Sequence, residues 1–110
     1  MTSPHEFPSI VFFDIDGTLL NERNQIPVSA VDAIRSLRKN GHLAFINTGR
    51  SRVGIYPHIL EIQFDGIIAA CGTYIEYHNQ QLMNKTIDSE FLIELFQVFQ
   101  NNKIHAFLEG

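Results

Sequence analysis

Two aspartates that follow a short apolar run are the residues of this sequence best suited to chemistry. Residues 10–13 are apolar, and Asp14, Asp16, Gly17 and Thr18 come directly after them. A continuous apolar run that ends in turn residues is typical of a strand buried on both faces. Burying unpaired carboxylates at the end of such a strand costs free energy, so we expect a cation or a positively charged side chain beside them. An ordinary Asp-Gly turn would account for Asp16 but does not require Asp14.

The pattern suits the transfer of a phosphoryl group. Asp14 is placed to act as a nucleophile, since carboxylates form covalent phospho-intermediates that divide one difficult displacement into two easier ones. Attack on an anion requires positive charge, and Mg²⁺, which prefers oxygen ligands and keeps several waters, suits Asp14 and Asp16 as part of its shell. Asp16 is also placed to act as general acid and then base. The N–H groups of Gly17 and Thr18 are expected to face a phosphate oxygen.

A second polar group follows the next apolar run, Leu43–Asn47. Thr48 offers a hydroxyl donor, and Gly49 lets the backbone approach an anion closely. Arg50 can either bind phosphate or tie the loop to a carboxylate. A plain turn after a strand explains this triplet equally well when the triplet is considered alone.

Other sites fit the sequence less well. An EF-hand loop that began at Asp14 would need Glu at its twelfth position, where the chain has Gln25. Cys71 has no neighbouring histidine to activate it and is expected to be a small buried hydrophobe. The five histidines lack metal-ligand spacing, and no dinucleotide or Walker A loop is present.

Alternating helix and strand patterns surround these polar groups. Strands are predicted at residues 9–14, 43–47 and 66–70, with a loop over residues 15–27. Helices are predicted at residues 28–40, with a capping box made by Ser29 and Asp32 and a stop at Gly41, and at residues 52–62, where Pro57 kinks or splits the helix. Strands and helices at this spacing indicate an α/β fold with a parallel sheet. The carboxyl ends of parallel strands share one edge, so residues 14–16, 48–50 and 71–73 should converge there.

The pattern changes after Thr73. Residues 74–77 and 81–85 flank the sequence His78-Asn79-Gln80, which predicts a β-hairpin. A helix capped by Asp88 or Ser89 is expected to run to about residue 102, with a wide apolar face. Residues 104–108 are expected to begin another strand. Both of these last elements lack a partner surface, so the chain is expected either to continue or to associate with another chain.

Composition narrows the class of protein. The chain has 110 residues, of which 45% are hydrophobic, and a net charge of -4. These values indicate one globular domain. Basic residues do not cluster with aromatic ones, which disfavours nucleic acid as a partner. No apolar run approaches the roughly 20 residues that span a membrane. The single cysteine and the absence of a recognisable secretory signal predict a cytoplasmic location.

These motifs resemble those of one enzyme superfamily. Residues 14–20 (DIDGTLL) are similar to the first motif of the haloacid dehalogenase (HAD) superfamily of phosphatases. Residues 47–50 (NTGR) resemble the second motif of its Cof-type branch, whose members carry an α/β cap of class IIB. Residues 70–75 are similar to that branch's Asn-Gly segment, except that Cys71 stands where Asn is usual.

The resemblance implies a fold and a reaction. The fold is a Rossmann-like partial HAD core with three parallel strands, followed by a β-hairpin and the start of an α/β cap. The core and hairpin would occupy residues 1–85, and the cap would begin in residues 86–110. The reaction is the Mg²⁺-dependent hydrolysis of a small phosphorylated metabolite, often a sugar phosphate, through an aspartyl-phosphate. Asp14 would be the nucleophile, Asp16 the acid/base and Thr48 a phosphate ligand.

Two family elements are not found in the sequence. The third motif supplies a lysine beside the nucleophile, whereas Lys39, Lys85 and Lys103 stand in other contexts. The fourth motif supplies acidic residues that complete the Mg²⁺ shell. We therefore expect an N-terminal part of a phosphatase that is weakly active or inactive alone.

Two other classes of function are alternatives for this sequence. One is a non-catalytic module, derived from a HAD phosphatase, that self-associates through the incomplete cap. The other is a phospho-receiver domain, which is disfavoured because its aspartate would end the third strand, where Ala70 and Cys71 stand.

Overall fold

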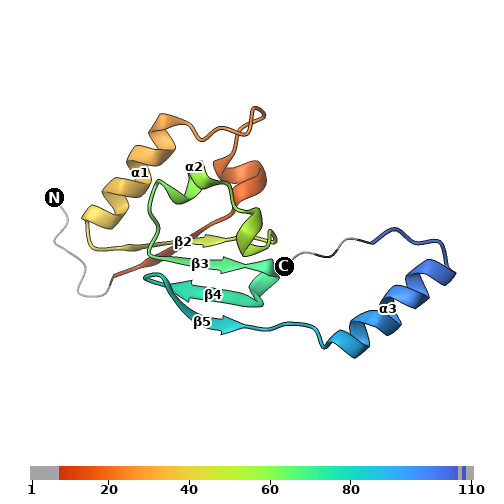
Figure 1. Cartoon of the computed structure of the whole chain (residues 1–110). Helices are drawn as coiled ribbons and strands as arrows, with labels where there is room; N and C mark the ends of the chain where they lie inside the picture. The colour runs from red at the N-terminus through yellow and green to blue at the C-terminus, as the bar shows by residue number, and fades with distance from the viewer. Residues whose placement is uncertain (1–7, 107, 109–110) are drawn as a thin grey trace.

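A mixed five-stranded sheet forms the centre of the computed structural model, which describes residues 8–106 and residue 108. Strands β1 (Ile10–Phe13), β2 (Leu43–Asn47) and β3 (Gly66–Ala69) run parallel to one another. Strands β4 (Tyr74–Tyr77) and β5 (Gln80–Asn84) continue the sheet in antiparallel pairing, in the order β1-β2-β3-β4-β5 (Figure 1). The predicted α/β class and parallel three-stranded core are confirmed.

The strand register places the polar segments at one edge of the sheet. Phe13 lies opposite Ile46, and Asn47 lies opposite Ile68. The three segments that leave β1, β2 and β3 therefore start at nearly the same level. This is the edge at which open α/β sheets hold their ligands.

Helices α1 (Val28–Lys39) and α2 (Pro57–Leu60) lie over the same face of the sheet (Figure 1). Between them and the strands are two neighbouring clusters of buried apolar side chains. One cluster contains Ile59 of α2 with Ile46 and Ile67. The other contains Ile34 of α1 with Ala44. This burial fixes the sheet against its helices and holds the strand ends in place.

The start of α1 differs from the prediction. Pro27 is the N-cap, its carbonyl accepts from the N–H groups of Ala30 and Val31, and no side chain caps the helix. The predicted capping box is therefore wrong, because Ser29 already lies in the first turn. The predicted stop is confirmed: Gly41 has a φ of 89°, and its N–H donates to the Arg38 carbonyl. A residue without a Cβ is favoured at such an angle.

The helix predicted over residues 52–62 is split in two. A split was one of the two effects expected of Pro57, the other being a kink. A 3₁₀ turn, η2, covers Arg52–Gly54, and α2 begins at Pro57. Proline has no N–H to donate and a fixed φ, so it suits the first position of a helix and not its interior.

The other face of β1 is open, so the prediction of a strand buried on both faces is wrong. Ile10 is 48% exposed and Phe12 is 52% exposed. Phe12 packs edge-on against Phe45, which stacks on Tyr77, and together these rings cover part of this face. In the described part of the chain, the two helices beside the sheet lie on the opposite face.

Gly66 leaves room for this row of aromatic rings. A Cβ at this position would lie 2.2 Å from a ring carbon of Phe45. We expect Gly66→Ala to lower the free energy of unfolding by about 1–3 kcal/mol, because overpacking forces side chains off their rotamers. Urea denaturation checks this. Gly66→Ala should cost much less in a Phe45→Leu background, and equal costs in the two backgrounds would contradict the clash.

The hairpin between β4 and β5 has a two-residue turn. His78 and Asn79 both have positive φ, at 48° and 64°, and Tyr77 pairs with Gln80. Positive φ at both central residues is the mark of a type I′ turn, which matches the twist of the flanking strands. The predicted hairpin is present, but Gln80 belongs to the second strand and not to the turn.

Helix α3 (Ser89–Asn101) stands away from the sheet (Figure 1). Its N-cap is Asp88, with no side-chain capping bond. Phe91, Ile93 and Val98 are more than half exposed. The strand predicted at residues 104–108 is absent from residues 104–106, and residue 107 lies outside the described residues. No helix in the described ranges has the length and hydropathy needed to cross a membrane.

Candidate active site

The segment after β1 forms a single turn, η1 (Ile15–Leu19), which the Leu20 N–H closes by donating to the Ile15 carbonyl at 3.0 Å. Ile15 and Leu19 point into the core and anchor the turn, while Asp14 and Asp16 are exposed. The Asp14 carboxylate accepts a hydrogen bond from its neighbour, the N–H of Ile15, through Oδ1 at 2.9 Å. Gly17 has a φ of 77°, a conformation that glycine adopts without strain. The buried side chains thus hold both carboxylates at the surface of the strand edge.

Arg50 binds Asp16 with both arms of its guanidinium. Nε donates to Oδ2 at 2.8 Å, and Nη2 donates to Oδ1 at 2.7 Å. This bidentate pair is the strongest geometry for an arginine and a carboxylate. The hydrogen bonds from Arg50 lower the pKa of Asp16 below its usual value. Of the two roles foreseen for Arg50, the structure shows the tie to a carboxylate.

Two further contacts fix the guanidinium of Arg50. Nη1 donates to the Gly54 carbonyl at 3.0 Å, and the guanidinium carbon lies 4.5 Å from the centre of the Tyr56 ring. A cation over an aromatic face is a favourable arrangement. Gly54 and Tyr56 were not foreseen from the sequence, because no motif marks a residue that acts only by positioning another one.

The Thr48 segment is tied to the segment after β3. Thr48 is buried, and its hydroxyl oxygen accepts from the Arg50 N–H at 3.0 Å. The Ala70 N–H donates to the Arg50 carbonyl at 2.7 Å, and the Cys71 N–H donates to the Thr48 carbonyl at 3.3 Å. The structure therefore brings together the three segments that the sheet topology predicted to converge.

Cys71 is exposed, so the prediction of a buried hydrophobe is wrong. The chain turns sharply after β3 with Ala70, Cys71 and Gly72 all at positive φ, and this turn carries the cysteine outward. Its Sγ lies 4.0 Å from the Gly49 carbonyl oxygen. The left-handed conformation is unfavourable for residues other than glycine, asparagine and aspartate. The turn therefore needs the two hydrogen bonds from Ala70 and Cys71 to stabilise it.

The carboxylates at this edge fit part of a Mg²⁺ shell. Of the two carboxylate oxygens of Asp14, Oδ1 accepts a hydrogen bond from the described residues and Oδ2 does not, so Oδ2 is left for a cation. Both oxygens of Asp16 are bound to Arg50. In the described ranges no group of three His, Cys, Asp or Glu side chains could hold a metal. Mg²⁺ keeps several waters, so one or two protein oxygens suffice for weak binding.

Removing the guanidinium should change the titration of Asp16. We expect Arg50→Gln to raise the pKa of Asp16 towards its ordinary value near 4, since the hydrogen-bonding cation is lost. Carboxyl ¹³C chemical shifts measured against pH check this. Arg52→Gln is the control, because Arg52 pairs with Glu76. An unchanged pKa in Arg50→Gln, or an equal rise in both variants, would contradict the assignment.

Comparison with known proteins agrees with this geometry. A family model described as haloacid dehalogenase-like hydrolase matches residues 11–110. A pyridoxal phosphate phosphatase of Escherichia coli is 26% identical over 102 residues, which are 90% of this chain and 38% of that protein. Two solved structures resemble the fold. One is a protein of Geobacillus kaustophilus, with a TM-score of 0.78 and 32% identity, over 88% of this chain and 38% of that one. The other is described as a HAD subclass IIB sugar phosphatase, with a TM-score of 0.73 and 29% identity, over 87% of this chain and 38% of that one.

Proposed function

The chain belongs to the haloacid dehalogenase-like hydrolases, and we propose that its Asp14 edge carries Mg²⁺-dependent hydrolysis of phosphomonoesters. The observation that supports this best is the convergence of Asp14, Asp16 and Thr48 at the carboxyl edge of a parallel sheet. The chain spans a little over a third of the length of the relatives described above, so the activity of a longer protein is part of the proposal.

The proposed reaction has two steps. A carboxylate oxygen of Asp14 attacks phosphorus, the bond to the leaving oxygen breaks, and Asp16 gives that oxygen a proton. Asp16 then takes a proton from water as the water oxygen attacks phosphorus, which frees Asp14 and releases phosphate. The lowered pKa keeps Asp16 ionised, which is the form needed for the second step. The first step needs the protonated form, so Arg50 must withdraw from Asp16 before it.

A small set of residues would surround the transferred phosphoryl group. Asp14, together with a backbone carbonyl near Asp16, would hold Mg²⁺, which when bound would neutralise charge on the phosphate. Thr48 would donate its hydroxyl, and the backbone at Gly49 would approach the anion closely. The N–H groups of Gly17 and Thr18 would face another phosphate oxygen. No lysine in the described ranges pairs with Asp14 or Asp16, so charge neutralisation is incomplete and slow turnover is expected.

The substrate class proposed for the site is a small phosphorylated metabolite. Two of the similar proteins are described as a pyridoxal phosphate phosphatase and a sugar phosphatase, and their named substrates are small phosphate monoesters. We also propose the division into a partial core with hairpin (residues 1–85) and the first part of a cap (residues 86–110). Helix α3 stands apart from the sheet, which supports this division. A cytoplasmic location stays a prediction.

Hydrolysis of a panel of monoesters tests the proposal. With aryl, sugar and pyridoxal phosphates, we expect Mg²⁺-dependent turnover by this chain that is at least roughly 100-fold below the 10 s⁻¹ typical of enzymes. A chelator should remove it. Turnover unaffected by the chelator would contradict the Mg²⁺ site. If turnover were near 10 s⁻¹ and Asp14→Asn abolished it, the result would support the proposed reaction but contradict the prediction that this chain alone is weakly active.

A second candidate is a non-catalytic module that self-associates through α3. The exposure of Phe91, Ile93 and Val98 on that helix favours it. Sedimentation equilibrium separates the two candidates. A folded monomer at all concentrations would count against self-association, and a dimer that Phe91→Ser dissociates would support it.

A further inference from the structure

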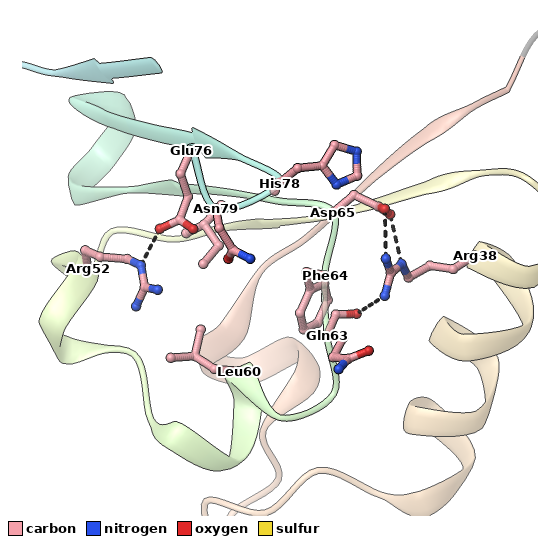
Figure 2. Close-up of a pocket in the computed structure, with 11 residues that line it drawn as sticks. Arg38, Arg52, Leu60, Gln63, Phe64, Asp65, Glu76, His78 and Asn79 are labelled. Carbon is pink, nitrogen blue, oxygen red and sulfur yellow. Dashed lines mark hydrogen bonds and ion pairs between the residues drawn. The ribbon is translucent and has the colours of Figure 1, made fainter. Parts of the chain in front are cut away.

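A cavity of about 370 Å³ lies on the helix-covered side of the sheet, beside the β4–β5 turn. None of the residues assigned to the phosphate site line it. Figure 2 shows Arg52 on one side, the Arg38–Asp65 pair on the other, Asn79 between them and Leu60 opposite Asn79. The volume falls within the range of roughly 300–1,000 Å³ that is usual for small-molecule sites.

One wall carries an ion pair with unused hydrogen-bonding groups. The Glu76 side chain is only 8% exposed, and its Oε1 accepts from Arg52 Nε and from the Tyr74 hydroxyl. Its Oε2 accepts no hydrogen bond from the described residues. Every fully buried side-chain nitrogen or oxygen in those residues has a partner, so Oε2 is not fully buried, and Glu76 is one of the residues that line the cavity. Figure 2 shows the two Nη groups of Arg52 turned away from Glu76.

In the ion pair on the other side of the cavity, Arg38 and Asp65 already have hydrogen-bond partners within the protein. Arg38 donates Nε and Nη2 to Asp65 at 3.0 Å each, and Nη1 to the Gln63 carbonyl at 2.9 Å. Asp65 also accepts from the Ala44 N–H at 2.9 Å. This second pair therefore has a structural role. Since the two arginines and two acids cancel in charge, the cavity offers no net attraction to an anion such as phosphate.

We propose that this cavity binds a zwitterionic α-amino acid with an apolar side chain. Its carboxylate would accept from the Nη groups of Arg52, a geometry in which arginine is strongest. Its ammonium would donate to Oε2 of Glu76. The two charged groups of an α-amino acid share one carbon, so they can reach both members of one ion pair. Leu60 and Phe64 in the lining supply apolar surface for the side chain.

Titration calorimetry of the full chain with L-phenylalanine and L-leucine tests the proposal. N-acetyl-L-phenylalanine lacks the ammonium, and phenethylamine lacks the carboxylate, so each should bind at least tenfold more weakly than L-phenylalanine. Inorganic phosphate should not compete. The proposal is overturned if the folded chain binds neither amino acid, if either analogue binds as tightly, or if phosphate displaces the amino acid.

Three variants locate the site. Glu76→Gln should weaken binding of L-phenylalanine at least tenfold. Asn79→Gly removes a side chain that lines the cavity, so it should weaken binding of L-phenylalanine several-fold. This variant should fold, because glycine suits the φ of 64° at this turn position. Arg35→Gln, on the exposed part of α1, is the control and should leave binding unchanged. If Glu76→Gln and Asn79→Gly each bind L-phenylalanine with unchanged affinity, the ligand lies elsewhere and the proposal is overturned. Phosphoryl transfer at Asp14 is measured separately, so neither result depends on the other.

Discussion

Asp14→Asn is expected to abolish the capture of beryllofluoride, a mimic of the phosphoryl group that bonds to an aspartate carboxylate. The amide has no anionic oxygen with which to coordinate beryllium, and it does not attract Mg²⁺. The substitution should leave the fold intact, because the amide oxygen can still accept the hydrogen bond from the Ile15 N–H. We expect complete loss of the bound ¹⁹F resonance that the unchanged chain shows with Mg²⁺.

The control for this experiment is Asp32→Asn. Asp32 is an exposed residue of α1 and takes no part in the proposed site. It should leave the bound ¹⁹F signal unchanged. Retention of the signal by Asp14→Asn, or its loss in both variants, would show that Asp14 is not the carboxylate that accepts the group.

Asp65→Ala is expected to be the most destabilising of the substitutions considered. The side chain is 7% exposed and accepts from the guanidinium of Arg38 and from the Ala44 N–H. Its removal leaves the Ala44 N–H and two of the Arg38 donor groups without their partner, and it removes the ion pair that joins α1 to the residue before β3. Breaking a buried pair costs about 3–5 kcal/mol, and because the Arg38 side chain is 31% exposed we expect a cost at the lower end of that range. Because small domains have only about 5–15 kcal/mol of stability, urea denaturation should show a large shift.

The same contacts give a pH dependence. Burial alone would raise the pKa of Asp65, but the hydrogen bonds from Arg38 and Ala44 outweigh it, and the pKa lies below its usual value. In the window between the folded pKa and the unfolded value near 4, the unfolded chain binds more protons. Asp65 therefore contributes stability above pH 4, and this contribution is lost as pH falls through the folded pKa.

Stability curves from pH 7 to pH 2 check this sign. The difference between the unchanged chain and Asp65→Asn should be largest near neutral pH and should shrink as acid protonates the carboxylate. Asp32→Asn serves again as the control, and its curve should follow that of the unchanged chain. A difference that grows as pH falls would contradict the assignment.

The sheet and the convergence of its loops could be predicted because apolar runs and turn residues are local signals. The strands, α1, the hairpin and the segments at Asp14 and Thr48 all follow from such patterns. The phosphate-site assignments for Gly17, Thr18 and Gly49 remain predictions, since they concern a ligand.

Predictions from the sequence were wrong where long-range packing or backbone conformation determines whether a residue is buried. The apolar run of β1 does not reveal which face a helix will cover, so its burial on both faces was wrong. Cys71 is exposed because three successive residues adopt positive φ, for which Ala70 and Cys71 give no signal. The Arg38–Asp65 pair joins residues 27 positions apart and has no motif. The choice between the two roles of Arg50 likewise needed the position of Asp16.

The proposed nucleophile is tested most directly by trapping the phosphorylated chain. The chain is incubated with acetyl phosphate and Mg²⁺, the acyl phosphate is reduced with borohydride, and the modified residue is located by peptide mass spectrometry. We predict conversion of Asp14 to homoserine in the presence of Mg²⁺ and none after chelation. Modification at another carboxylate, or none at Asp14 in a folded chain with Mg²⁺, would contradict the account.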